Sequence, residues 1–115
     1  MTIQIPHLAN EYVEVTNNSE PARFLALFAD DAIVHDAGRV HRGRAAIRDW
    51  SQREIFDVQV SIDVLDVAER DGRTVLTTKV DGNFDRTGLP DPVIIEQRFR
   101  FEGNAIQELE CVLKQ

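Results

Sequence analysis

The sequence predicts an α+β fold, in which three helices near the N-terminus pack on a strongly curved, mostly antiparallel β-sheet. Apolar residues recur at helical spacing in three segments before residue 57. Beyond that point, apolar and polar residues alternate over long segments that end in glycine-containing turns. The chain has 115 residues, of which 43% are hydrophobic, so residues 1–115 are expected to form one domain with its own core.

Two helices are predicted first. One runs from Pro6 to about Thr16, where Tyr12 lies on an apolar face. The next segment contains Ser19, a preferred capping residue, and then Pro21, which is favoured in the first turn of a helix. We therefore expect a second helix from Ser19 to about residue 29, and the two helices to form a hairpin.

A strand and a third helix are predicted next. Residues 30–36 form a short apolar run that ends at Asp36, before an Ala-Gly turn signal. After Gly43, an apolar stripe that includes Trp50 predicts an amphipathic helix to about residue 56. The arginines and aspartates of this helix lie on its opposite side.

Four long strands follow, in residues 58–70, 73–84, 92–102 and 105–113. The alternation of the first strand changes phase near residues 64–65, which indicates a β-bulge. Asp71 and Gly72 are a strong signal for a tight hairpin turn between the first two strands. A curved sheet of this kind encloses a cavity if the helices close only one end.

Alternation along the last two strands separates an inner from an outer face. In residues 92–102 the outer face carries Glu96, Arg98 and Arg100. Glu108 and Glu110 of the last strand are expected to form ion pairs with these arginines. The inner face is apolar except for Gln97, whose amide needs hydrogen-bond partners when buried.

Composition limits the classes of ligand and location. The formal net charge of −7 argues against a general nucleic-acid binder, which needs a basic face. The sequence shows no signal peptide and no stretch of about eighteen apolar residues, so neither secretion nor membrane insertion is expected. Cys111 is the only cysteine, which excludes an internal disulfide and is typical of a protein in a reducing cytoplasm.

The sequence gives little support for a metal or a cofactor. His7 and His41 lack the spacing of a metal-binding motif, so we expect no metal. No pattern indicates a nucleotide, flavin or nicotinamide site, so any chemistry is expected to be cofactor-free acid-base work. The basic run at residues 39–44 either attracts an anionic ligand to the cavity mouth or is a solvated turn before the third helix.

Two stretches carry a family resemblance: FLALFADDAIVHDAGRVHRGRAAIRDW, residues 24–50, and VDGNF with LPDPVIIEQRFRFEGNAIQEL, within residues 80–109. In this order they resemble the nuclear transport factor 2-like superfamily, especially its SnoaL-like members. The resemblance implies a single SnoaL-like domain with a cystatin-like cone, a pocket open at one end, and a homodimer. The superfamily holds enzymes, adaptors and binding proteins, so the fold alone does not define the function.

The resemblance extends to the ketosteroid isomerases, which combine an aspartate base with a tyrosine donor and a protonated aspartate donor. Aligned on these motifs, the base falls on Asp36 and the tyrosine on Tyr12. The second aspartate falls on Gln97, whose amide donates a hydrogen bond without any change of protonation. The supporting tyrosines of that family are replaced by Phe28 and Ser51, so steroid isomerisation itself is not expected.

Each of these residues also has a purely structural interpretation. Asp36 either takes a proton in the pocket or makes a local hydrogen bond in the turn that follows it. Tyr12 is either a donor to a ligand or a core residue. His35 is expected to point away from the face that carries Asp36, because side chains alternate along a strand.

The expected ligand is a small, flat and mostly hydrophobic molecule, because aromatic residues predominate among the candidates for the pocket wall. Residues expected to line the pocket or to pack behind it are Phe24, Phe28, Val34, Trp50, Phe84, Phe99, Phe101, Leu109 and Cys111. Three functions remain open. The first is a cofactor-free isomerase, cyclase, dehydratase or hydratase with Asp36 as base. The second is a binding module without turnover. The third is an association module that dimerises through its outer sheet face.

Overall fold

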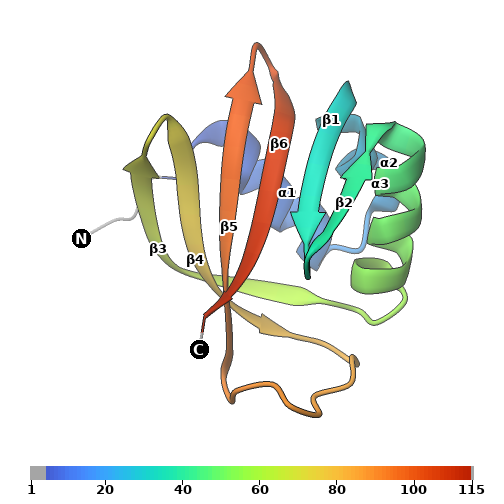
Figure 1. The fold of residues 1–115 in the computed structure, drawn as a ribbon, viewed down its shortest axis with the longest axis vertical. Coiled ribbons are helices and arrows are strands. Elements are labelled where there is room, and N and C mark those ends of the chain that lie inside the picture. The colour runs from blue at the N-terminus through green and yellow to red at the C-terminus, as the bar shows by residue number, and fades with distance from the viewer. Residues whose placement is uncertain (1–4, 115) are drawn as a thin grey trace.

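The structure, a computed structural model, describes residues 5–114. The helices are α1 (His7–Asn17), α2 (Pro21–Ala26) and α3 (Gly43–Ser51), and α3 continues into a π-helical turn, η1 (Gln52–Phe56). The strands are β1 (Phe28–Asp36), β2 (Arg39–Arg42), β3 (Ser61–Arg70), β4 (Arg73–Asp81), β5 (Val93–Glu102) and β6 (Ala105–Lys114). The predicted α+β class is confirmed, because three helices pack against one curved sheet (Figure 1).

The six strands follow the order β2-β1-β6-β5-β4-β3. Neighbours are antiparallel except for β1 and β6, which run parallel. Figure 1 shows α1 and α2 behind the strands and α3 beside β2. The sheet therefore has an inner face toward the helices and an outer face that no helix of the described residues covers. In residues 5–114, no helix has the length and apolar character needed to cross a membrane.

The hairpin of β3 and β4 follows the sequence signals closely. Asp71 and Gly72 have φ angles of 54° and 75°, as a tight two-residue hairpin turn requires. The pairing register shifts between Val64 and Asp66, so the predicted bulge is confirmed. The extra residue lets Val64 and Val67 face the same inner side although three positions separate them.

Two local predictions are wrong. Ser19 does not cap α2, because it has a φ of 56° and the helix begins two residues later, at Pro21. Residues 39–42 are not a turn but the strand β2, which pairs with β1. Because β2 is a four-residue edge strand with three exposed residues, it needs no apolar alternation and leaves no strand signal in the sequence.

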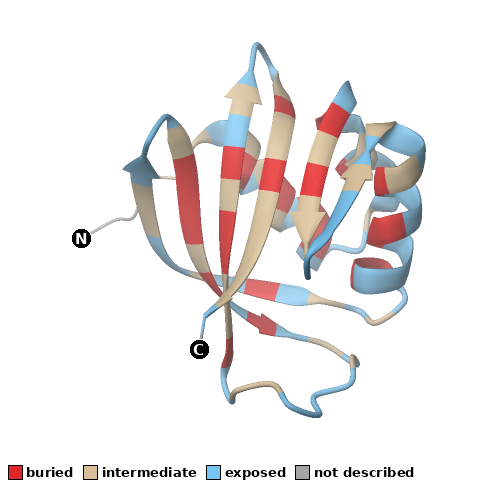
Figure 2. Ribbon diagram, in the orientation of Figure 1, coloured by how far each residue is buried: buried red, intermediate tan, exposed pale blue. Residues whose placement is uncertain are grey.

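Phe24 of α2 lies at the centre of the core and is fully buried. Its ring centroid is 5.1 Å from that of Tyr12, 5.3 Å from that of Phe28 and 5.4 Å from that of Phe56. Figure 2 shows buried residues at alternating strand positions and on the helix sides that face the sheet. The core therefore joins the helices to the inner face of the sheet.

The predicted ion pairs across the outer face are confirmed. Arg98 lies 3.3 Å from Glu110, and Arg100 lies 3.8 Å from Glu108. His35 also lies on this face, 3.1 Å from Glu108. Its side chain therefore points away from the inner side of β1, as the alternation predicts.

Glu96 is the most buried charged residue of the outer face, with 5% of its surface exposed. Three cations hold its carboxylate: Arg98 at 2.9 Å, Arg70 at 3.2 Å and Lys114 at 3.3 Å. Burial alone would raise the pKa of this carboxyl, but hydrogen bonds from the three cations lower it from 4.5 to about 2. Glu96 therefore remains charged in the folded protein at pH values where an unfolded chain would protonate it.

Acid is expected to destabilise the protein through Glu96. Because the pKa of Glu96 is lower in the folded state, its contribution is complete above about pH 5 and is lost as the pH falls toward 2. Between about pH 6 and about pH 3, this loss amounts to about 2 kcal/mol. Urea unfolding at both pH values should show a loss in Glu96→Gln that is smaller than the loss in the wild type by about this amount.

The exposed Glu102 of the same strand provides the matched control. Glu102→Gln is expected to keep the acid sensitivity of the wild type. Equal pH dependence of the unfolding free energy in Glu96→Gln and the wild type would contradict the role given to Glu96.

Candidate active site

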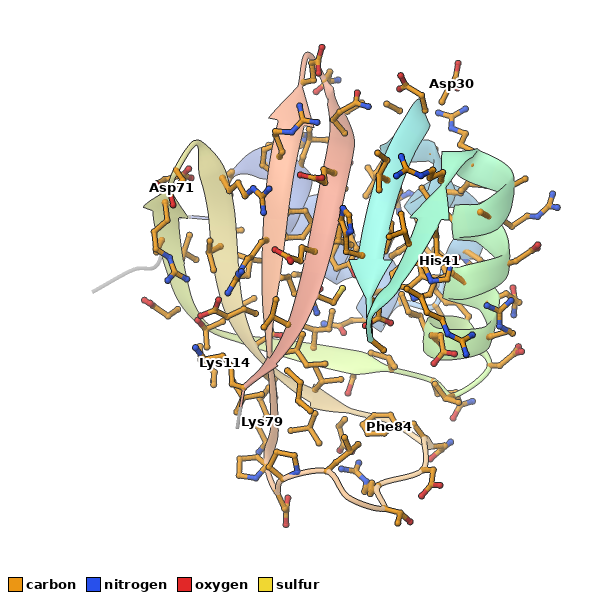
Figure 3. The ribbon with its side chains drawn as sticks, viewed as in Figure 1. Asp30, His41, Asp71, Lys79, Phe84 and Lys114 are labelled. Atoms are coloured by element: carbon orange, nitrogen blue, oxygen red, sulfur yellow. The ribbon has the colours of Figure 1, made fainter. Side chains whose placement is uncertain are left out.

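A cavity of about 530 Å³ lies at one end of the inner face of the sheet. The loop 82–92 between β4 and β5 forms part of its wall, and Figure 3 places Phe84 of this loop near the end of the molecule that carries Lys79 and Lys114. Most of the wall is apolar: Ile55, Val60, Ile62, Val80, Leu89, Val93, Ile95, Val112 and Leu113. The size and lining are typical of a site for a small organic molecule.

Three polar side chains of this wall lie in one row across the sheet. Asp36 of β1 is the register partner of Cys111 in β6, and Cys111 is the partner of Gln97 in β5. Neighbouring strands are about 4.8 Å apart, so about 10 Å separates the backbones of Asp36 and Gln97. The parallel pairing of β1 with β6 thus brings both residues to one cavity.

Asp36 is held by a tertiary hydrogen bond and by a tight turn. The indole N–H of Trp50 in α3 donates to Asp36 Oδ2 at 2.9 Å. Ala37 and Gly38, which follow, have φ angles of 52° and 76° and join β1 to β2 as a two-residue hairpin loop. Positive φ is unfavourable for alanine and persists only where the surrounding structure imposes it. The turn therefore fixes the backbone beside Asp36 at some conformational cost.

Tyr12 borders the same cavity from α1 and is 2% exposed. Its ring packs against Phe24 and Phe99, with centroid distances of 5.1 and 5.0 Å. Burial raises the pKa of Tyr12 well above 10.0, and repulsion from Cys111 and Asp36 raises it further. Tyr12 therefore stays protonated at neutral pH, as a hydrogen-bond donor must. Among residues 5–114, its hydroxyl donates no hydrogen bond, and no buried side-chain nitrogen or oxygen lacks a partner, so the hydroxyl is open to the cavity.

Gln97 and Cys111 are hydrogen-bonded to each other on the cavity wall. The Cys111 thiol donates to Gln97 Oε1 at 3.3 Å, which leaves the amide nitrogen of Gln97 as a donor toward the cavity. Burial, followed by repulsion from Asp36 and Glu110, raises the pKa of Cys111 well above its usual value. The thiol is therefore neutral at neutral pH and poorly suited to act as a nucleophile.

The residues expected to line the pocket fall into two groups. Trp50, Phe84 and Cys111 border the cavity. The other six do not border it but lie in the core or pack against it: Phe24, Phe28, Val34, Phe99, Phe101 and Leu109. The α1–α2 hairpin brings aromatic rings close to the sheet, so these side chains fill the closed part of the fold.

The sequence prediction missed several residues of the wall. Ile62 and Val80 are register partners of β3 and β4 and line the cavity together. Their place in the alternation of each strand is the signal that identifies them. Asp85 and Leu89 belong to the loop 82–92, which has no periodicity from which their position follows.

The basic residues at positions 39–44 do not border the cavity. Arg44 donates to the Phe28 carbonyl oxygen at 2.8 and 3.1 Å and lies 3.1 Å from Asp30. The ring of His41 lies 5.9 Å from that of Trp50, on the edge strand β2. An anion site at this run therefore lacks support. Within the part of the chain that the structure describes, no group of three acidic, histidine or cysteine residues is arranged to hold a metal.

The sequence of residues 9–109 matches the family model of the SnoaL-like domain. Among curated proteins, no relative matches significantly.

Solved structures share the fold over nearly the whole chain. A Sinorhizobium meliloti protein, proposed to be a polyketide cyclase, is 24% identical, with a TM-score of 0.82 and coverage of 93% of this chain and 94% of that one. A ketosteroid isomerase-like protein from Catenulispora acidiphila, solved in complex with trimethylamine, is 19% identical, with a TM-score of 0.77 and coverage of 94% and 85%.

The Δ5-3-ketosteroid isomerase of a Mycobacterium species is 15% identical, with a TM-score of 0.72 and coverage of 93% and 90%. TM-scores of 0.72 to 0.82 show a common fold, whereas identities of 15% to 24% do not carry the chemistry of these proteins over to this chain.

Proposed function

The chain belongs to the SnoaL-like domain family, and we propose that it binds a small, mostly apolar molecule in the cavity and moves a proton on it, with Asp36 as general base. The observation that supports this proposal is that Asp36, Tyr12 and Gln97 border one cavity although they lie far apart in the sequence. A base and two hydrogen-bond donors around an apolar space suit proton abstraction from a carbon next to a carbonyl group.

In the proposed step, a carboxylate oxygen of Asp36 takes a proton from that carbon. The C–H bond breaks, and its electron pair moves toward the carbonyl oxygen, which becomes an enolate oxygen. Tyr12 and Gln97 donate hydrogen bonds to this oxygen. In a ligand with a carbon–carbon double bond next to that carbon, the enolate extends over the double bond. Asp36 then returns the proton to the far carbon of the double bond, so the double bond moves and the ligand is isomerised. In a ligand with two carbonyl groups, the enolate carbon attacks the second one, the new alkoxide takes the proton, and a ring closes.

Trp50 and Cys111 are positioning residues in this proposal. Because the Trp50 indole holds Asp36 Oδ2, the other oxygen, Oδ1, is the one proposed to accept the proton. Because the Cys111 thiol donates to Gln97 Oε1, the amide nitrogen is the proposed donor to the ligand. Both contacts orient the polar groups before the ligand binds, which lowers the cost of reorganisation during the reaction.

An NMR assay of proton exchange in D₂O tests the proposal with a panel of cyclic ketones. The wild type is expected to accelerate exchange at the carbons next to the carbonyl. Tyr12→Phe, which removes one donor, is expected to lower that rate by about 10². Ser61→Ala is the matched control, because it removes an exposed hydroxyl from β3 that does not border the cavity. Unchanged exchange in Tyr12→Phe would contradict the donor role.

A second candidate function is ligand binding without turnover. It is favoured by the absence of a tyrosine network behind Tyr12: Phe28 is a fully buried core residue, and the Ser51 hydroxyl donates to the Arg48 carbonyl oxygen at 3.1 Å. The same experiments separate the two functions. A ketone that shifts the Trp50 indole resonance but shows no accelerated exchange would favour the binding module.

Assembly and location are proposals of the same kind. We propose a homodimer that uses the outer sheet face, and a cytoplasmic protein. The first rests on the absence of a helical layer over that face in residues 5–114 (Figure 1). The second rests on the single cysteine, Cys111, because proteins in a reducing compartment seldom contain disulfides.

A further inference from the structure

The charged side chains among the described residues of the cavity wall are all acidic. The described residues that border the cavity include three carboxylates, Asp36, Glu54 and Asp85, and include no lysine, arginine or histidine. Glu54 and Asp85 are exposed, whereas Asp36 is half-buried. Two carboxylates therefore stand where the cavity meets solvent, and one lies deeper.

The nearby cations do not face the cavity. Arg86 follows Asp85 in the loop, but it is paired with Asp81 and stacks on the Phe84 ring, 4.7 Å from its centroid. Lys79 and Lys114 lie near this end of the molecule (Figure 3). Both belong to the outer face, since Ile94 pairs with each of them in register and alternates with the inner residues of β5. None of these cations borders the cavity.

The negative charge of Asp36 also affects the groups that lie inside the cavity. After burial, repulsion from Asp36 is a further cause of the raised pKa of both Tyr12 and Cys111. A group that stabilises the protonated forms of two neighbours also stabilises a cation placed near them. An anion in the same place would meet repulsion that no cation of the wall offsets.

Two further observations indicate that the cavity is built for a ligand. Tyr12 and Gln97 are 98% and 95% buried, as their exposures of 2% and 5% show. Among the described residues, neither the Tyr12 hydroxyl nor the Gln97 amide nitrogen donates a hydrogen bond. No buried side-chain nitrogen or oxygen of these residues lacks a partner, so both donors are open to the cavity that their residues border. Trp50 and Phe84 add aromatic surface, and aromatic faces attract organic cations.

We infer that the ligand of this cavity carries a basic nitrogen, as a protonated amine or a quaternary ammonium group, on an apolar body. The cationic end lies toward Glu54 and Asp85 at the mouth, and the apolar body contacts the sheet beside Asp36. This inference rests on the proposed function of the cavity as a small-molecule site. It narrows the expected hydrophobic ligand to one class and excludes carboxylates and phosphates.

Three matched probes test the charge preference: cyclohexylmethylamine, cyclohexylmethanol and cyclohexanecarboxylate. Binding is followed at pH 7 through the indole N–H resonance of Trp50, the single tryptophan, which is hydrogen-bonded to Asp36 on the cavity wall. The amine is expected to bind about 10-fold more tightly than the alcohol, and the carboxylate more weakly than either. The preference should shrink in about 0.5 M salt, because Glu54 and Asp85 are exposed.

Variants identify the charges responsible. Glu54→Gln with Asp85→Asn is expected to lower the affinity for the amine about 5-fold and to leave the affinity for the alcohol unchanged. Asp63→Asn with Asp66→Asn is the matched control, because it removes two exposed carboxylates from β3 that do not border the cavity. This control separates local contacts from the effect of net charge.

The outcomes distinguish this inference from the proposed function. If the alcohol binds but the carboxylate binds as tightly as the amine, the inference of a cationic ligand fails, whereas the proposal of a small-molecule site remains supported. The inference also fails if the control pair lowers amine affinity as much as the pair on the cavity wall. If none of the probes shifts the Trp50 resonance, both the inference and the proposed small-molecule site fail.

Discussion

Replacing Asp36 with asparagine is expected to lower the rate of ketone proton exchange by about 10³-fold, because an amide oxygen is not basic enough to take a proton from carbon. Asparagine has nearly the same shape as aspartate. Its Oδ1 can still accept the hydrogen bond that Trp50 donates to Asp36 at 2.9 Å. Folding and ligand binding should therefore persist, and exchange in D₂O, urea unfolding and the Trp50 resonance measure the three properties separately.

Asp31→Asn on the same strand is the matched control. Asp31 is exposed and accepts a hydrogen bond from Gln107 at 3.0 Å, so its replacement should leave exchange unchanged. Exchange by Asp36→Asn within a factor of about two of the wild type would remove Asp36 from the role of base. If Asp36→Asn instead lowers the free energy of unfolding, and neither pH nor ligand changes that loss, Asp36 has a structural role in the turn.

Replacing Phe24 with alanine is expected to have the largest effect on stability, a loss of about 3–5 kcal/mol in the free energy of unfolding. Phe24 is fully buried. Its ring contacts those of Tyr12, Phe28 and Phe56, with the ring of Trp50 at 6.3 Å. The vacated space lies between helices and sheet, where several elements must move to close it. Urea unfolding monitored by circular dichroism measures the loss.

Phe84→Ala is the contrasting variant. Phe84 lies on the loop 82–92, is only partly buried and borders the cavity, so its loss should cost no more than about 1 kcal/mol of stability. It should nevertheless weaken binding of the amine probe, because it removes aromatic wall. Equal losses of stability in the two variants would contradict the placement of Phe24 in the core and Phe84 at the cavity.

The alternation of apolar and polar residues predicted which side chains of the long strands face the inside of the sheet. In β5 it assigned Gln97 to the inner face and Glu96 and Arg98 to the outer face. In the structure, Gln97 borders the cavity, and Glu96 and Arg98 form an ion pair on the outer face. It failed for β2, where exposed residues at a sheet edge need no apolar pattern. Strand pairing, rather than propensity, makes that segment extended.

Distinguishing the cavity wall from the core behind it lay beyond the sequence. Phe24, Phe28 and Phe84 are chemically the same, yet only Phe84 borders the cavity. The difference depends on how closely α2 approaches the sheet and on the path of the loop 82–92, which no local pattern encodes. The bond between Trp50 and Asp36 likewise joins two elements whose separation in space only the folded structure defines.

The parallel contact of β1 with β6 also has a consequence for folding. It places Asp36 beside Cys111, 75 positions later in the chain, so the cavity wall closes through a contact between segments that are distant in sequence. Such contacts form slowly, because a long loop must be ordered before they stabilise the chain. During synthesis the helices and β3–β4 precede β6, and the carboxylate of Asp36 gains its neighbours Cys111 and Gln97 only when the last strand docks. An early-folded fragment of this chain would therefore hold the aspartate but lack the binding site.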